Sequence, residues 1–172
     1  MRCRKLIIVF ALLSICLCIF VFLPLQKVFT FTETRAEHPN VHYIPISAEQ
    51  KFQIRYTHSI HKSDVWESYQ TVQGNRIQML EMEYEDLAIG MPGYAEENQT
   101  LIQRDGKYVL QFDKNKIIDD FTIYIGDLDL DLVLIYEDVE YDLKKDLGRG
   151  KSYLFKIRRL SLYEQWKGVK MK

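Results

Sequence analysis

The densest group of chemically versatile side chains lies between residues 56 and 67, where the sequence reads YTHSIHKSDVWE. It contains the hydroxyl, imidazole and carboxylate groups of a hydrolytic triad. However, His58 and Ser59 are adjacent, and neighbouring side chains of an extended chain point to opposite faces, which prevents a nucleophile–base pair. The sequence also lacks the G-x-S-x-G turn that exposes a nucleophilic serine in hydrolases. We therefore expect no catalytic residues and no enzymatic activity.

The same segment offers a candidate metal site in His58, His61 and Glu67. A turn could bring these side chains together, but their spacing matches no recognised metal-binding motif. In the alternative structural role, His58 and Ser59 hydrogen-bond a loop and Glu67 accepts from backbone donors. We favour the structural role and expect neither a metal nor another cofactor. A metal-dependent enzyme is the least favoured alternative.

Asp127, Asp129 and Asp131 alternate with leucines, as the carboxylates at the start of an EF-hand calcium loop alternate with other residues. The remainder of that motif is missing, because Leu132 stands at the sixth position, which requires glycine, and Asp138 replaces the glutamate at the twelfth. Alternating Asp and Leu is also typical of a strand with one wet and one buried face. The pattern favours a strand over a calcium site.

The element that decides where the chain works is the apolar run over residues 6–25, LIIVFALLSICLCIFVFLPL. A helix of this length spans about 30 Å, the thickness of a bilayer's hydrocarbon core. It is too long for a signal-peptide core and no small-residue cleavage pattern follows it, so we expect an uncleaved, single-pass signal anchor. The preceding basic start, residues 1–5, predicts a cytoplasmic N-terminus and an extracytoplasmic remainder at the cell membrane.

The composition limits the exported part further. All three cysteines, Cys3, Cys16 and Cys18, lie in or before the apolar run, so the exported part cannot form disulfides. A formal net charge of -1 provides no general basic field, and we expect no nucleic-acid partner.

Beyond the anchor we expect three segments. Residues 26–40 carry turn formers and charges without a hydrophobic period, which predicts a polar spacer. Residues 41–160 have the size of one β-rich extracytoplasmic domain. Residues 161–172 mix cations with Tyr163 and Trp166 and could lie on a membrane surface, but we favour a frayed basic tail. We also expect residues 40–172 to fold without the helix.

Short strands with turns between them follow one another through the exported part. Strict alternation of apolar and polar residues over 51–57 predicts a half-buried strand, and hairpins are expected around residues 73–75 and 104–106. Further strands are predicted over 67–72, 76–82, 100–103, 108–112, 121–125, 132–136, 139–143 and 152–157. This pattern favours an all-β ectodomain, either a β-sandwich or a partly open barrel.

Residues 52–94 resemble a small prokaryotic family catalogued as domain of unknown function 1850. The resemblance rests on an aromatic-x-His-Ser pair, a following glutamate, a hairpin, an acidic strand and a Gly-x-Pro-type loop. The corresponding residues here are Tyr56, His58, Ser59, Glu67, Glu83, Gly90 and Pro92. We take as the candidate ligand or partner surface Tyr56, His58, Ser59, Glu67, Gly90, Pro92 and Gly93.

The resemblance implies a context rather than a reaction. Members are commonly encoded beside the membrane subunits of TAXI-type TRAP transporters, which take small organic anions from an extracytoplasmic binding protein. The expected function is therefore a membrane-anchored transport accessory, with the bilayer as partner through residues 6–25. Its expected protein partner is the transporter's membrane subunit or its solute-binding protein. The alternative is an extracytoplasmic small-ligand-binding module with a pocket formed by His58, Ser59, Glu67 and residues 90–93.

Overall fold

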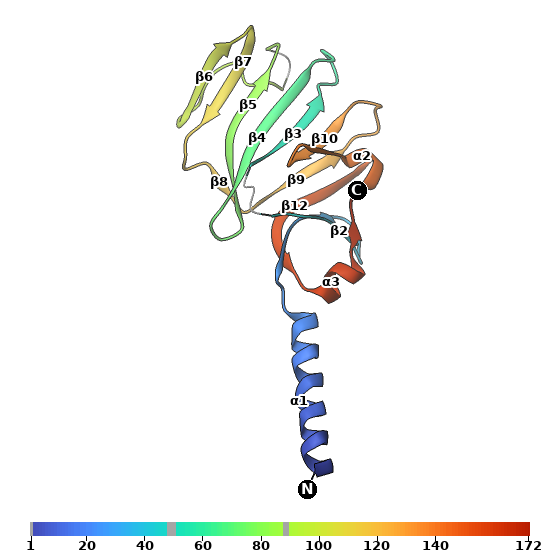
Figure 1. The fold of residues 1–172 in the computed structure, drawn as a ribbon. Helices are drawn as coiled ribbons and strands as arrows, with labels where there is room; N and C mark the ends of the chain where they lie inside the picture. Colours follow the sequence, from blue (N-terminus) through green and yellow to red (C-terminus); the bar gives the residue numbers. More distant parts are fainter. Residues whose placement is uncertain (1, 48–50, 88–89) are drawn as a thin grey trace.

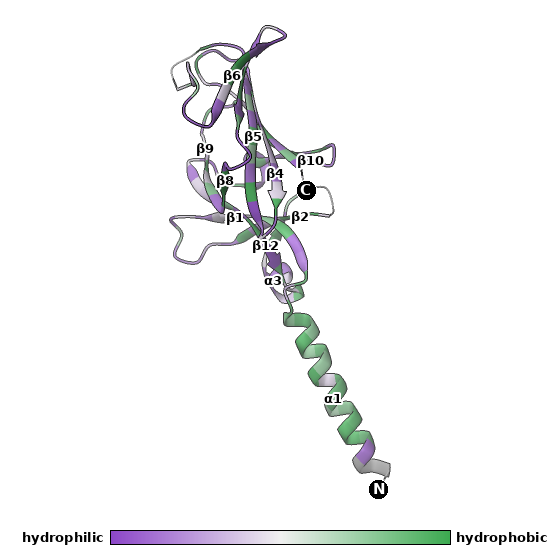
Figure 2. Ribbon diagram, turned by 90° about the vertical axis from the view of Figure 1, so that its left-hand side faces the viewer, coloured by the Kyte–Doolittle hydropathy of each residue, from purple (hydrophilic) through white to green (hydrophobic). Residues whose placement is uncertain are grey.

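The computed structural model describes residues 2–47, 51–87 and 90–172, and consists of one long helix and a β-rich domain (Figure 1). The helix α1 (Arg2–Phe22) projects from the domain, and Figure 2 shows it hydrophobic along most of its length, with hydrophilic residues near its N-terminal end. Its segment Lys5–Phe22 is long and apolar enough to cross a membrane, and none of it is buried against the domain. This confirms the expected apolar N-terminal helix, whose length and composition fit a membrane span.

Two sheets form the domain, which confirms the all-β fold class. The five-stranded small sheet has the order β13 (Val169–Lys170), β2 (Val41–Pro45), β1 (Gln26–Glu33), β12 (Lys151–Leu160), β9 (Asp120–Ile125). The eight-stranded large sheet has the order β11 (Val139–Asp142), β10 (Leu132–Tyr136), β3 (Lys51–Thr57), β4 (Asp64–Val72), β5 (Arg76–Tyr84), β7 (Lys107–Phe112), β6 (Gln99–Arg104), and β8 (Ile117–Ile118) also pairs with β5. Two short helices, α2 (Leu143–Asp146) and α3 (Leu162–Lys167), complete it.

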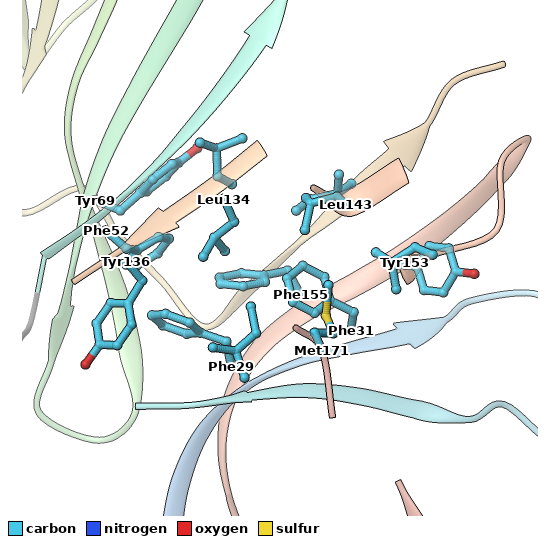
Figure 3. Close-up of a cluster of buried hydrophobic side chains, with 14 of the residues drawn as sticks. Phe29, Phe31, Phe52, Tyr69, Leu134, Tyr136, Leu143, Tyr153, Phe155 and Met171 are labelled. Atoms are coloured by element: carbon cyan, nitrogen blue, oxygen red, sulfur yellow. The ribbon is translucent and has the colours of Figure 1, made fainter. Parts of the chain in front are cut away.

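The core lies between the two sheets and is rich in aromatic rings (Figure 3). Phe155 of β12 is fully buried, and its ring centroid lies 5.0–5.6 Å from those of four other phenylalanines. Three of them, Phe29, Phe31 and Phe121, come from the small sheet, and Phe52 comes from the large sheet. Aromatic contacts across the interface therefore hold the two sheets together.

The spacer predicted over residues 26–40 is wrong for its first half. Residues 26–33 form β1, which pairs along its length with β12 and also with β2. Residues 28–31 are all buried, including Thr30, whose hydroxyl donates to the carbonyl of Lys156 at 2.9 Å. Because β1 is covered on both faces, the contrast between wet and dry faces that marks a strand in a sequence is absent. The domain therefore begins at residue 26, not at residue 41.

The basic tail predicted over residues 161–172 is also wrong, because these residues fold. Ser161 caps α3 through a reciprocal capping box with Glu164, and β13 then pairs in parallel with β2. Met171 is 3% exposed and belongs to the main core. The segment mixes cations and exposed apolar residues with the buried Met171, so its composition does not indicate that it is ordered.

Candidate functional site

A cavity of about 780 Å³ opens between the two sheets. Strands β3, β4, β5 and β8 of the large sheet form one wall, and β9 and the β9–β10 loop form the other. Its apolar lining comes mainly from Ile54, Tyr69, Met79, Ile118 and Phe121. The volume falls within the range of about 300–1,000 Å³ that is typical of small-molecule sites. This cavity is the main candidate site of the domain.

Glu67 places a carboxylate in this apolar cavity because of its position on β4. Val65, Glu67 and Tyr69 follow one another at the two-residue period of a strand, so all three face the inner side of the sheet. The register between β4 and β5 shifts between Ser68 and Tyr69, which marks a β-bulge beside the carboxylate. A bulge re-aims neighbouring side chains and increases the local twist, and such features are common next to binding sites.

The surroundings of Glu67 disfavour its ionised form. The Tyr69 hydroxyl donates a hydrogen bond to Oε2 of Glu67 at 2.6 Å. Burial raises the pKa of Glu67, and the hydrogen bond from Tyr69 opposes this shift only in part. Burial, together with the nearby Glu67 charge, also raises the pKa of Tyr56 and Tyr69. Among residues 5–47, 51–87 and 90–172, no Lys, Arg or His forms an ion pair with Glu67.

The structure brings together three of the seven candidate residues. Tyr56, Ser59 and Glu67 all line the inter-sheet cavity. His58 lies in the β3–β4 turn, where its Nδ1 accepts from the backbone N–H of His61 at 3.4 Å and its own N–H donates to Ser63 at 2.8 Å. The hydrogen bonds of His58 are those of a residue that organises a turn.

Gly90, Pro92 and Gly93 do not line this cavity. They line a separate pocket of about 430 Å³ beside β5 and β7. The Tyr84 hydroxyl donates to the carbonyl of Pro92 and fixes this loop to β5. The expected single pocket of His58, Ser59, Glu67 and residues 90–93 is therefore divided between a turn and two pockets.

The candidate metal ligands do not converge. No group of three or more His, Cys, Asp or Glu side chains that could hold a metal ion occurs in the part of the chain that the structure describes. His61 Nδ1 instead lies 3.4 Å from Asp86 Oδ2. Glu67 contacts Tyr69 and lines the cavity.

The aspartates at 127, 129 and 131 lie in the β9–β10 loop, so the strand predicted for them is wrong. Arg149 binds Asp129 at 2.6 Å, and Arg55 binds Asp131 at 3.3 Å. The backbone N–H of Gly150 donates to Ile125 at 2.7 Å and joins the α2–β12 turn to the end of β9. These contacts stabilise a loop that lines the cavity.

Replacing Glu67 with glutamine should make stability less sensitive to rising pH. The folded-state pKa of Glu67 is raised, so its ionisation destabilises the fold as pH rises from the unfolded pKa, about 4.3, through the folded pKa. Below this window the cost is absent, and above it the cost is complete. The free energy of unfolding of Glu67→Gln, relative to the natural protein, should therefore increase as pH rises above about 4 in urea titrations.

The exposed Glu85 provides the matched control, because it lines neither pocket. Glu85→Gln should show no comparable rise over this pH range. A difference between Glu67→Gln and the natural protein that stays constant with pH would contradict the assigned environment of Glu67.

Comparison with known proteins gives a family but no described activity. No curated protein and no solved structure matches the chain significantly. The model of the DUF1850 family, described as a domain of unknown function, matches residues 52–143. The matched segment runs from β3 to the start of α2 and includes Tyr56, Ser59, Glu67 and the second cavity wall. Because it covers more than half of the 172 residues, the chain belongs to the DUF1850 family.

Proposed function

We propose that this chain is a membrane-anchored accessory protein of a TAXI-type TRAP transporter, with its β-domain on the extracytoplasmic face of the cell membrane. The observation that carries the proposal is the mounting of the domain on α1. Only residues 23–25 separate α1 from β1, and β1 is an interior strand of the small sheet. Because no flexible linker intervenes, the domain stays close to the membrane surface, where a membrane subunit or a protein docked on it can be reached.

Contacts around α3 support this close mounting. The rings of Phe22 in α1 and Tyr163 in α3 lie 5.1 Å apart, and Arg159 donates to the carbonyl of Leu25 at 3.0 Å. Trp166 is 80% exposed on α3, which lies beside the end of α1 in Figure 1. Tryptophan and tyrosine are favoured at the membrane–water interface, so α3 is suited to the headgroup region.

Two further considerations support the orientation and the partner. The basic residues Arg2, Arg4 and Lys5 precede the apolar helix, and the positive-inside rule retains that end in the cytoplasm. The chain belongs to the DUF1850 family. The association with TAXI-type membrane subunits that we expect for this family from the sequence supports the proposed partner.

Photo-crosslinking in native membranes tests this proposal. A photoreactive residue at Leu162 or Trp166, both exposed on α3, should capture a transporter membrane subunit or its solute-binding protein. The matched control position is Asp105, in the turn of the β6–β7 hairpin at the end of the domain away from α1 (Figure 1). Recovery of neither transporter component from any position would overturn the proposal.

The inter-sheet cavity favours a second candidate function, the binding of a small extracytoplasmic ligand. Its volume of about 780 Å³ and its largely apolar lining are those of a ligand site. The pocket differs from the one expected from the sequence. Tyr69 and Phe121 line it, whereas His58 and residues 90–93 do not. The two functions are compatible, since an accessory domain can respond to a ligand.

A further inference from the structure

We propose that the inter-sheet cavity binds an amine, a small molecule with an apolar body and a cationic head that pairs with Glu67. This inference rests on the second candidate function above and defines the chemical class of its ligand. It is carried by the chemistry of the cavity, which combines apolar walls with one inward-facing carboxylate that has no cationic partner in the described residues.

Glu67 is held in place with one oxygen available. Tyr69 donates to Oε2, whereas no hydrogen bond from the described residues reaches Oε1. The Tyr69 ring is itself fixed, because Phe52 stacks on it at 5.1 Å and Phe121 at 5.4 Å, as the side chains labelled in Figure 3 show for Phe52. A pre-positioned acceptor loses little freedom when a ligand binds, so its hydrogen bond contributes more to affinity.

The missing cation explains why an amine is the preferred ligand. A carboxylate shielded from water is costly unless a charge or donors compensate it. The burial that raises the pKa of Glu67 is such an uncompensated cost. An ammonium group at Oε1 would supply both an opposite charge and N–H donors, and charge-assisted hydrogen bonds of this kind are among the strongest in proteins.

Charged residues also line the cavity away from Glu67. They are Asp127, Asp131, which pairs with Arg55 at 3.3 Å, and Lys144, which donates to the carbonyl of Leu128 at 2.6 Å. An organic anion beside the ionised Glu67 would meet a like charge, whereas an ammonium group would meet the opposite charge. The cavity therefore favours a cationic ligand over the small organic anions expected as the cargo of TAXI-type transporters.

The walls define the remainder of the ligand. Ile54, Met79, Ile118 and Phe121 present aliphatic, thioether and aromatic surfaces to the cavity. Each buried methylene of a ligand contributes about 0.8 kcal/mol, so an aryl or alkyl body is favoured here. An arylalkylamine combines this body with the required head, and phenethylamine is the simplest probe.

The test measures binding calorimetrically to the full chain in nanodiscs of zwitterionic lipid, with empty nanodiscs as blank. Three probes share one body and differ in the head: phenethylamine, phenethyl alcohol and phenylacetate. At mildly alkaline pH, phenethylamine should bind roughly tenfold to a hundredfold more tightly than phenethyl alcohol, the factor expected for one charge-assisted hydrogen bond. Phenylacetate should bind most weakly.

The variant Glu67→Gln should remove the preference of the cavity for phenethylamine over phenethyl alcohol. Glu85→Gln, which removes an exposed carboxylate outside the cavity, should preserve the preference. Circular dichroism verifies that both variants are folded.

The outcomes separate the ligand class from the binding function. Equal binding of the amine and the alcohol, or stronger binding of phenylacetate, would overturn the amine and leave the binding function standing. Failure of all three probes to bind beyond the empty-nanodisc blank would overturn both.

Discussion

A chain that begins at residue 26 should fold into a β-rich domain without α1, whereas a chain that begins at residue 40 should remain unfolded. The shorter chain lacks β1, an interior strand that pairs with β12 and β2. It also lacks Phe29 and Phe31, which are fully buried in the core. Loss of either side chain alone costs about 3–5 kcal/mol, and the net stability of a domain is only about 5–15 kcal/mol.

Far-ultraviolet circular dichroism and urea unfolding of the two chains measure this difference. The chain from residue 26 should unfold cooperatively, and reducing agents should leave its unfolding unchanged because it contains no cysteine. A third chain, which begins at Thr34, separates the loss of β1 from the loss of residues 34–39 and should behave like the shortest one. Cooperative unfolding of the chain from residue 40 would show that β1 is dispensable and would restore the spacer predicted from the sequence.

The contrast between one wet and one buried face explains why β3 could be predicted and β1 could not. In β3, Phe52 and Ile54 are buried while the alternating residues Lys51 and Gln53 are more exposed, and the predicted range is the observed one. In β1, Thr30 is as buried as Phe29, because the residues around Tyr43 cover the outer face. Its sequence therefore lacks the distinction on which the prediction depends.

One feature of the sequence indicates the fold of the C-terminal segment. Ser161 and Glu164 have the spacing of a capping box, which marks the start of a helix. No feature of this kind indicates the pairing of β13 with β2, because a parallel bridge between residues so distant in the sequence depends on the tertiary fold. Short elements of this kind depend on long-range packing more than on their own propensity.

One wall of the candidate site could be predicted from the sequence. Val65, Glu67 and Tyr69 share the two-residue period, so Glu67 could have been assigned to the apolar face beside Tyr69. The opposite wall could not be assigned in this way, because Phe121 reaches the cavity through the packing of β9 and β12 against the large sheet. The separation of Gly90 from Glu67 likewise depends on where a loop docks.

The variant Phe155→Ala should lower the free energy of unfolding by about 3–5 kcal/mol, the largest effect expected for a single truncation in this domain. Phe155 is fully buried and contacts the rings of Phe29, Phe31, Phe52 and Phe121. Removal of its ring leaves a cavity where the two sheets meet. It also removes aromatic contacts, which contribute to stability beyond the area that they bury. Urea unfolding of the chain from residue 26 measures the loss.

Tyr94 provides the matched control, because it is an aromatic residue that is 73% exposed. Tyr94→Ala should change the free energy of unfolding by no more than about 0.5 kcal/mol. Phe155→Leu, which retains part of the buried volume, should fall between the two, since the cost of a core truncation grows with the cavity that it leaves. If Phe155→Ala cost no more than Tyr94→Ala, the sheets could not be held together by this aromatic cluster, and the cavity beside Glu67 would lose the wall formed by Phe121.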